Sequence, residues 1–104
     1  MFIFYSVHYP QPDKEELFAE NMRQFDELMK QQIGIVFVSP YPFKDPERGA
    51  LVGISIWESQ EAFQAAIPNL KETKDYSFLE WEAKTSELYL LNSTDCNSPV
   101  FVKW

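Results

Sequence analysis

The ten residues Ile54-Ser55-Ile56-Trp57-Glu58-Ser59-Gln60-Glu61-Ala62-Phe63 contain the strongest structural signal in this sequence. Apolar residues first alternate along the chain and then recur at helical spacing, with Trp57 at the junction. Ser59 is a residue type that caps helix N-termini, so a helix is expected to begin at Gln60. The stretch therefore predicts a strand that leads directly into a helix.

The predicted strand has two different faces. Alternation places one set of side chains on each side of a sheet. One face is aliphatic and consists of Val52, Ile54 and Ile56. The other face carries the junction Trp and consists of Gly53, Ser55 and Trp57.

The same patterns predict the order of elements in the rest of the chain. Strands are expected at about 2–9, 33–38, 50–57 and 87–91, and helices at about 13–32, from 60 to Pro68, and near 75–84. Asp13 and Glu16 imitate a capping box, Pro68 is expected to limit the second helix, and residues 43–49 carry turn signals. The order β-α-β-β-α-β predicts an α+β, ferredoxin-like fold with helices on one face of an antiparallel sheet.

The first predicted helix is amphipathic. Apolar side chains recur at spacings of four, three and four and are interpreted as a core contact: Phe18, Met22, Phe25 and Met29. Acidic residues of the same segment are interpreted as a solvated surface: Glu15, Glu16, Glu20, Asp26 and Glu27.

Composition limits the classes of function. The 104 residues predict one domain, 1–104, with a core at about 2–91 and a C-terminal extension at 92–104. The net charge of −7 disfavours binding to nucleic acids and to anionic membrane surfaces. Neither a signal peptide nor a membrane span is recognisable, and Cys96 has no partner for an intrachain disulfide, so a cytosolic location is expected.

Aromatic residues are abundant, with nine Phe, five Tyr and three Trp. A sheet covered by helices on one side leaves its other face open, so this surplus suggests that the open face meets a second subunit or a ligand. We therefore expect a homodimer. The apolar C-terminal run 99–104 is expected to pair with a sheet edge, which can belong to the partner subunit.

The element order, the length of the first helix and the W-E-S-x-E-A-F junction at 57–63 resemble the antibiotic biosynthesis monooxygenase family of dimeric α/β-barrel proteins. The resemblance covers about residues 2–91. It implies that two ferredoxin-like subunits join their sheets into a barrel, with a small pocket between sheet and helices in each subunit. Some members of that family oxygenate phenols or quinols with molecular oxygen and no cofactor, others degrade haem, and many have no assigned activity.

The resemblance makes Trp57, His8 and Tyr5 the candidate catalytic residues. An electron-rich aromatic anion can donate an electron to oxygen itself, so a site needs an apolar cavity, a few hydrogen-bond donors and a base. The Trp57 indole could donate a hydrogen bond, or the residue could serve in packing alone. Tyr5 and His8 lie on opposite faces of the first strand, so at most one of them faces the same cavity.

Cofactor and metal sites are not predicted. The haem-degrading members resemble one another in a first-strand Asn, a junction Trp and a helical His, of which only Trp57 is present here, and this disfavours haem degradation. One His and one distant Cys form no recognisable metal-ligand spacing. The resemblance thus implies a cofactor-independent monooxygenase of a small aromatic, phenol or quinol. The alternative is a non-catalytic ligand-binding or dimeric assembly module of the same fold.

Overall fold

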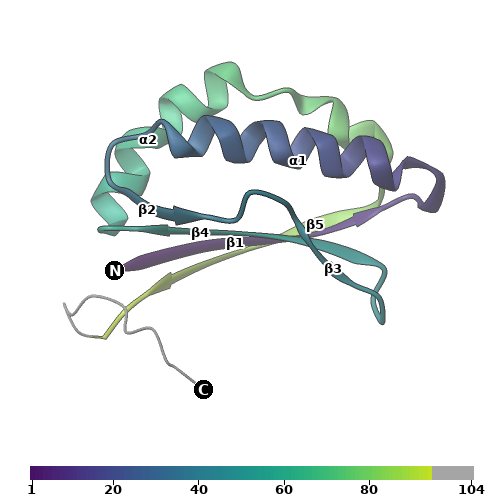
Figure 1. The fold of residues 1–104 in the computed structure, drawn as a ribbon, viewed down its shortest axis with the longest axis horizontal. Coiled ribbons are helices and arrows are strands. Elements are labelled where there is room, and N and C mark those ends of the chain that lie inside the picture. The colour runs from purple at the N-terminus through teal and green to yellow at the C-terminus, as the bar shows by residue number, and fades with distance from the viewer. Residues whose placement is uncertain (95–104) are drawn as a thin grey trace.

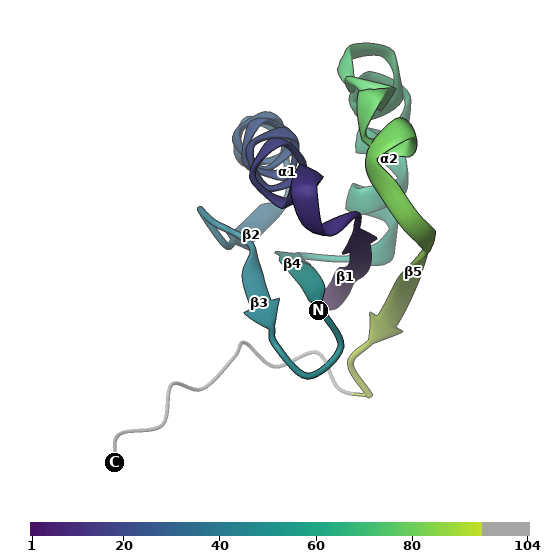
Figure 2. The same cartoon turned by 90° about the vertical axis from the view of Figure 1, so that its right-hand side faces the viewer.

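The computed structural model describes residues 1–94, which form one antiparallel sheet with two helices on a single face (Figure 1). The strands are β1 (Phe2–Pro10), β2 (Ile35–Val38), β3 (Phe43–Asp45), β4 (Ala50–Trp57) and β5 (Glu82–Asn92). The helices are α1 (Glu15–Lys30) and α2 (Gln60–Thr73), and they lie side by side over the sheet in the end-on view (Figure 2). The α+β, ferredoxin-like prediction is confirmed.

The sheet order is β2-β4-β1-β5, so the first strand of the chain lies in the middle. β4 pairs with β1 along most of its length, for example Phe2 with Trp57 and Val7 with Val52. β2 and β3 both pair with the outer edge of β4, β2 at one end and β3 at the other. The turn signals at residues 43–49 predict a long hairpin tip, but Phe43–Asp45 pairs with β4 before the turn begins, so the tip is shorter than predicted.

Two helix boundaries differ from prediction. α1 follows a 3₁₀ turn at Pro12–Lys14 and has no side-chain cap, so the capping box expected at Asp13 does not form. α2 continues through Pro68 to Thr73. Pro68 lies on the exposed side of α2, so water can hydrate the carbonyl group of the preceding turn that receives no N–H from the proline. The buried Leu70 packs the next turn against the core.

The last part of the chain also differs in its boundaries. The third helical stretch expected near 75–84 is a 3₁₀ helix at Tyr76–Trp81, in which Phe78 is buried but Leu79 is exposed. β5 then begins at Glu82, five residues before the predicted strand start. The predictions for Cys96 and for the C-terminal run fall outside the described residues.

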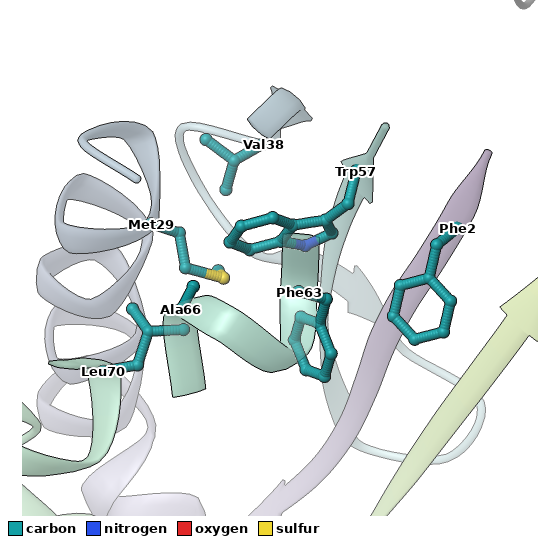
Figure 3. Packing of buried hydrophobic residues seen from close by; sticks show 7 residues of the cluster. All are labelled: Phe2, Met29, Val38, Trp57, Phe63, Ala66 and Leu70. Atoms are coloured by element: carbon teal, nitrogen blue, oxygen red, sulfur yellow. The ribbon is translucent and has the colours of Figure 1, made fainter. Parts of the chain in front are cut away.

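Ser59 caps α2 as predicted, since its hydroxyl accepts a hydrogen bond from the Ala62 N–H at 3.1 Å. The junction before it supplies the centre of one hydrophobic cluster. The fully buried Trp57 ring points toward Met29 and Val38 and packs edge-on against Phe63, with ring centroids 5.4 Å apart (Figure 3). This cluster joins both helices to the sheet.

Among residues 1–94, no helix covers the opposite face of the sheet (Figures 1 and 2). The aliphatic set Val52, Ile54 and Ile56 lies there, and Tyr5 stacks on Tyr89 in the neighbouring strand. None of the described helices is long and apolar enough to cross a membrane. The cytosolic location stays a prediction.

Candidate functional site

A cavity lies between α1 and the helix-covered face of the sheet. β1 and β4 supply its floor, α1 its roof, and Lys74 and Phe78 lie on its wall. The cavity volume is about 70 Å³, which is enough for about five waters. It is roughly half of the 150 Å³ that holds a benzene ring in a closed cavity, so an aromatic ligand must extend beyond this space. The lining is mainly apolar, with a small number of polar groups, as is usual for small-molecule sites.

Gly53 keeps the floor of this cavity low. A Cβ atom at this position would lie 3.2 Å from the Met22 methyl group and 3.3 Å from the Ser6 hydroxyl. Any larger residue would therefore push into the space beneath α1 and toward Ser6.

His8 is buried on the cavity floor and has a hydrogen-bond partner on each ring nitrogen. Its Nε2 lies 2.8 Å from the Ser6 hydroxyl, and its Nδ1 lies 2.7 Å from the Ser86 hydroxyl. Ser86 in turn donates to a Glu82 carboxylate oxygen at 2.5 Å. Because the Ser86 proton points to Glu82, Ser86 accepts from His8 Nδ1–H, and Nε2 is left as the acceptor for Ser6.

Ser86 enters this chain of hydrogen bonds from the position opposite His8 in β5. The register that pairs Ser6 with Leu88 and Val7 with Glu87 continues to His8 and Ser86, and residues directly opposite each other point to the same face of the sheet. A β-bulge follows, because Tyr9 pairs with Lys84 and β5 therefore has one extra residue. The result is a continuous path, Ser6 to His8 to Ser86 to Glu82, that leads from the cavity to the beginning of β5.

The imidazole is neutral at physiological pH. Burial, and to a lesser extent the nearby Lys74 ammonium group, lower the pKa of His8 from 6.5 to about 4. The rings of Phe18 and Phe78 pack against His8, with centroids 5.2 and 6.2 Å from it. His8 is thus a neutral hydrogen-bonding group and not a resident cation.

Lys74 provides a cationic side chain at the cavity wall. Its Nζ lies 4.5 Å from the ring centroids of both Phe25 and Phe78. Burial lowers the pKa of this ammonium group. The position follows the C-terminal end of α2, which exists only because the helix continues beyond Pro68.

Asp26 is buried on α1, which corrects the interpretation of this residue as part of a solvated acidic face. It lines the cavity, and burial raises the pKa of its carboxyl group to about 7, with a smaller contribution from Glu27. A helical position at this spacing falls on the same face as Met22 and Met29. This helical spacing is the sequence signal for the burial of Asp26.

Trp57 does not line the cavity. Its indole N–H donates to the Ser55 hydroxyl at 3.0 Å, and Ser55 is the residue that faces the cavity. Ser55 also donates to the Phe4 carbonyl at 3.4 Å. A catalytic role for Trp57 stays a prediction, but the structure gives its N–H a protein partner and makes it a support for Ser55.

Tyr5 lies on the open face of the sheet, opposite His8. Its ring stacks on Tyr89 with centroids 4.6 Å apart. The expectation that β1 directs at most one of the two residues to the cavity is confirmed, and that residue is His8. Ser6, Ser86 and Lys74 were not among the candidates, because single serines and lysines carry no distinctive pattern in a sequence.

No protein-family model matches this sequence, and no curated protein is significantly similar to it. Solved structures are similar in fold. A conserved protein from Methanosarcina mazei Go1 is 13% identical with a TM-score of 0.76, over 89% of this chain and 92% of the other. A Deinococcus radiodurans protein provisionally named as an antibiotic biosynthesis monooxygenase is 10% identical with a TM-score of 0.76, over 96% and 99% of the two chains.

A variant of SnoaB, a cofactor-independent oxygenase from Streptomyces nogalater, is 18% identical with a TM-score of 0.72, over 90% of this chain and 93% of that one. The chain has the antibiotic biosynthesis monooxygenase fold. At these identities the likeness establishes the fold, and it confirms the resemblance at that level. Among residues 1–94, no group of three or more His, Cys, Asp or Glu side chains is placed to hold a metal ion.

Proposed function

We propose that this protein is a cofactor-independent oxygenase that binds a small phenol or quinol in the cavity beneath α1. The hydrogen-bond path from Ser6 through His8 and Ser86 to Glu82 is the observation that supports the proposal most strongly. It offers a proton acceptor inside a mainly apolar cavity, and a base is one of the groups that such a reaction requires.

The path can remove a proton from a bound hydroxyl group without charging the imidazole. The substrate hydroxyl donates to Ser6, Ser6 passes its own proton to His8 Nε2, and the Nδ1 proton moves through Ser86 to Glu82. The proton therefore leaves the cavity, and His8 returns to a neutral state. A pKa of about 4 for His8 fits this role, because a stable imidazolium is never required.

The substrate supplies the electrons. Once it is deprotonated, the aromatic anion passes an electron to O2, and the two radicals combine. Oxidation of a phenol to a quinone, or of a quinol to a hydroxyquinone, gives up four electrons: a ring C–H bond is replaced by a C–O bond, one oxygen atom enters the product and the other leaves as water. No external reductant is therefore needed. The Lys74 ammonium group, at the cavity wall, stabilises the anionic intermediates.

Oxygen uptake tests this function. A panel of hydroquinones and anthrone-like compounds is added to the wild-type protein, to His8→Gln and to Glu82→Gln, with the exposed Glu72→Gln as a control. We expect turnover above the rate in buffer, a loss of about 10²–10⁴-fold for His8→Gln, and no change for the control.

Two outcomes would contradict the proposal. Oxygen uptake that never exceeds the rate in buffer would exclude oxygenation of these compounds. Native mass spectrometry could instead reveal a small molecule that remains bound and unaltered after incubation with oxygen, and this would favour the binding module over the enzyme.

A further inference from the structure

Asp26 carries a buried carboxyl group whose hydrogen bonding is incomplete within the described residues. It is 3% exposed, and its Oδ2 atom has no hydrogen-bond partner among residues 1–94. The other acidic residues of α1 lie at its exposed or half-exposed positions. A carboxyl group placed in this way costs stability, because burial removes the hydration of Oδ2 and no donor within residues 1–94 replaces it.

A purely structural role does not account for this residue. The charged groups that act on Asp26 from its own helix are Glu27, which disfavours the ionised form, and Lys30, which favours it more weakly. From the other elements around the cavity, the titratable groups are His8 on β1 and Lys74 after α2, and neither forms an ion pair with Asp26. Leu or Met would pack here at lower cost, so the carboxyl group is best explained by a ligand.

Asp26 and His8 lie toward opposite ends of the cavity. Phe18 is the α1 residue that packs on His8. Asp26 lies eight residues further along α1, which corresponds to about 12 Å along the helix axis. A ligand that fills the cavity therefore meets the Ser6 and His8 pair at one end and the carboxyl group at the other.

We propose that Asp26 accepts a hydrogen bond from a second hydroxyl group of the ligand, on the side of the ring opposite the hydroxyl that faces Ser6. The assignment rests on the proposed function, because it takes the cavity to be the site of a phenolic ligand. It deepens that function by selecting para-dihydroxy aromatic compounds over monohydroxy compounds. Asp26 is in this view a binding residue, while proton removal stays with the His8 path.

Calorimetry under nitrogen measures the selection without any oxygenation. The probes are hydroquinone and 4-methoxyphenol, which differ in one hydrogen-bond donor. We expect the wild-type protein to bind hydroquinone about tenfold more tightly than 4-methoxyphenol, as is usual for one buried hydrogen bond. Asp26→Leu should reduce this ratio to about one, whereas Glu16→Gln, an exposed carboxylate on the same helix, should leave it unchanged.

Thermal unfolding at pH 8 provides a second measurement that needs no ligand. Asp26→Leu should unfold at a higher temperature than the wild-type protein, because it removes a buried carboxylate without a partner. A lower unfolding temperature would mean that the protein uses the carboxyl group to hold its own structure, and this would overturn the proposal.

The outcomes separate the two proposals. If Asp26→Leu keeps the preference for hydroquinone, Asp26 does not accept the hydrogen bond from the second hydroxyl group, although the cavity remains the phenol site. If the wild-type protein binds neither probe, the dihydroxy ligand class is wrong, and oxygen uptake with the other phenols still tests the proposed function by itself.

Discussion

Trp57 and Ser55 act together at the residue scale. The indole fills the space between both helices and the sheet, and its N–H holds the Ser55 hydroxyl at the cavity floor. The side chain is therefore large, fully buried and hydrogen-bonded, and its role in stability can be separated from a role in ligand binding.

We expect Trp57→Phe to lower the free energy of unfolding by about 1–3 kcal/mol, because Ser55 loses a buried donor. Trp57→Ala should cost about 3–5 kcal/mol as a large core truncation. Urea unfolding gives both values, and Trp81→Phe, at a half-buried position, serves as the control. Turnover of the folded Trp57→Phe protein should stay near the wild-type value. A large loss of turnover in a protein that remains folded would instead show that the indole N–H donates a hydrogen bond to the substrate.

His8 and Asp26 have opposite effects on the pH dependence of stability. The pKa of His8 falls from 6.5 to about 4 on folding, so the unfolded chain binds more protons in that window and stability rises with pH. The pKa of Asp26 rises from 3.8 to about 7, so the folded chain binds more protons and stability falls as pH rises through that window. In the wild-type protein the two contributions offset each other.

Single variants should reveal each contribution. Relative to the wild-type protein, Asp26→Asn should become progressively more stable from pH 4 to pH 7, and His8→Gln progressively less stable from pH 4 to pH 6.5. Each change should amount to about 3 kcal/mol. Urea unfolding at four pH values measures the slopes, with Glu16→Gln as a control that follows the wild-type protein. Slopes of the same sign for both variants would contradict the assignment.

At the scale of elements, the link between α2 and β2 depends on close backbone contact. Gly34, just before β2, has a φ of +91°, and a Cβ atom there would lie 2.6 Å from the Ala62 Cβ. Its carbonyl accepts a hydrogen bond from the Glu58 N–H at 2.8 Å. Only glycine satisfies both the backbone conformation and the contact with α2.

Gly34→Ala should therefore destabilise the fold by about 2–4 kcal/mol, through backbone strain together with displacement of α2. Gly49→Ala is a matched control, because Gly49 also has a positive φ, of +63°, but a Cβ atom added there would have no neighbour within 4 Å. The control should cost only about 1 kcal/mol. Equal losses in thermal or urea unfolding would show that the contact with Ala62 does not matter.

The uncovered face of the sheet is the main feature at the scale of the whole molecule. It carries aliphatic and aromatic side chains from four neighbouring strands, including Tyr5, Phe37, Ile54 and Tyr89. We propose that a second copy of the chain covers this face. The proposal explains why apolar side chains continue across a surface that lacks helices within residues 1–94.

Light scattering at micromolar concentration should give twice the mass of one chain. Ile54→Lys, in the middle of the open face, should shift the protein toward monomers, because it would bury an unpaired charge in the interface. Ile33→Lys is the control, since Ile33 is 93% exposed beside α1 and is not on that face. A monomeric wild-type protein would refute the dimer.

Local patterns in the sequence were sufficient for the element order and for the junction at 50–63. The alternation along β4, the Ser59 cap and the face occupied by Trp57 depend on neighbouring residues alone, so the sequence predicts them correctly. The opposite directions of Tyr5 and His8 follow from the same two-residue period. Pro68 misled the prediction, because the tertiary contacts of Leu70 outweigh a local helix breaker.

The candidate site depended on tertiary structure. Asp26 looks like a surface carboxylate in the sequence, and only the packing of α1 over β1 and β4 buries it beside the cavity. The partner of His8 on β5 is Ser86, which lies 78 residues away in the sequence, and only the pairing of β1 with β5 places its hydroxyl beside the imidazole. Hydrophobic periodicity and helix capping depend on residues that are neighbours along the chain, so the sequence by itself determined the framework of strands and helices. Burial, hydrogen-bond partners and pKa values are set by segments that meet only after folding. The tertiary structure therefore decided the chemistry of the candidate site.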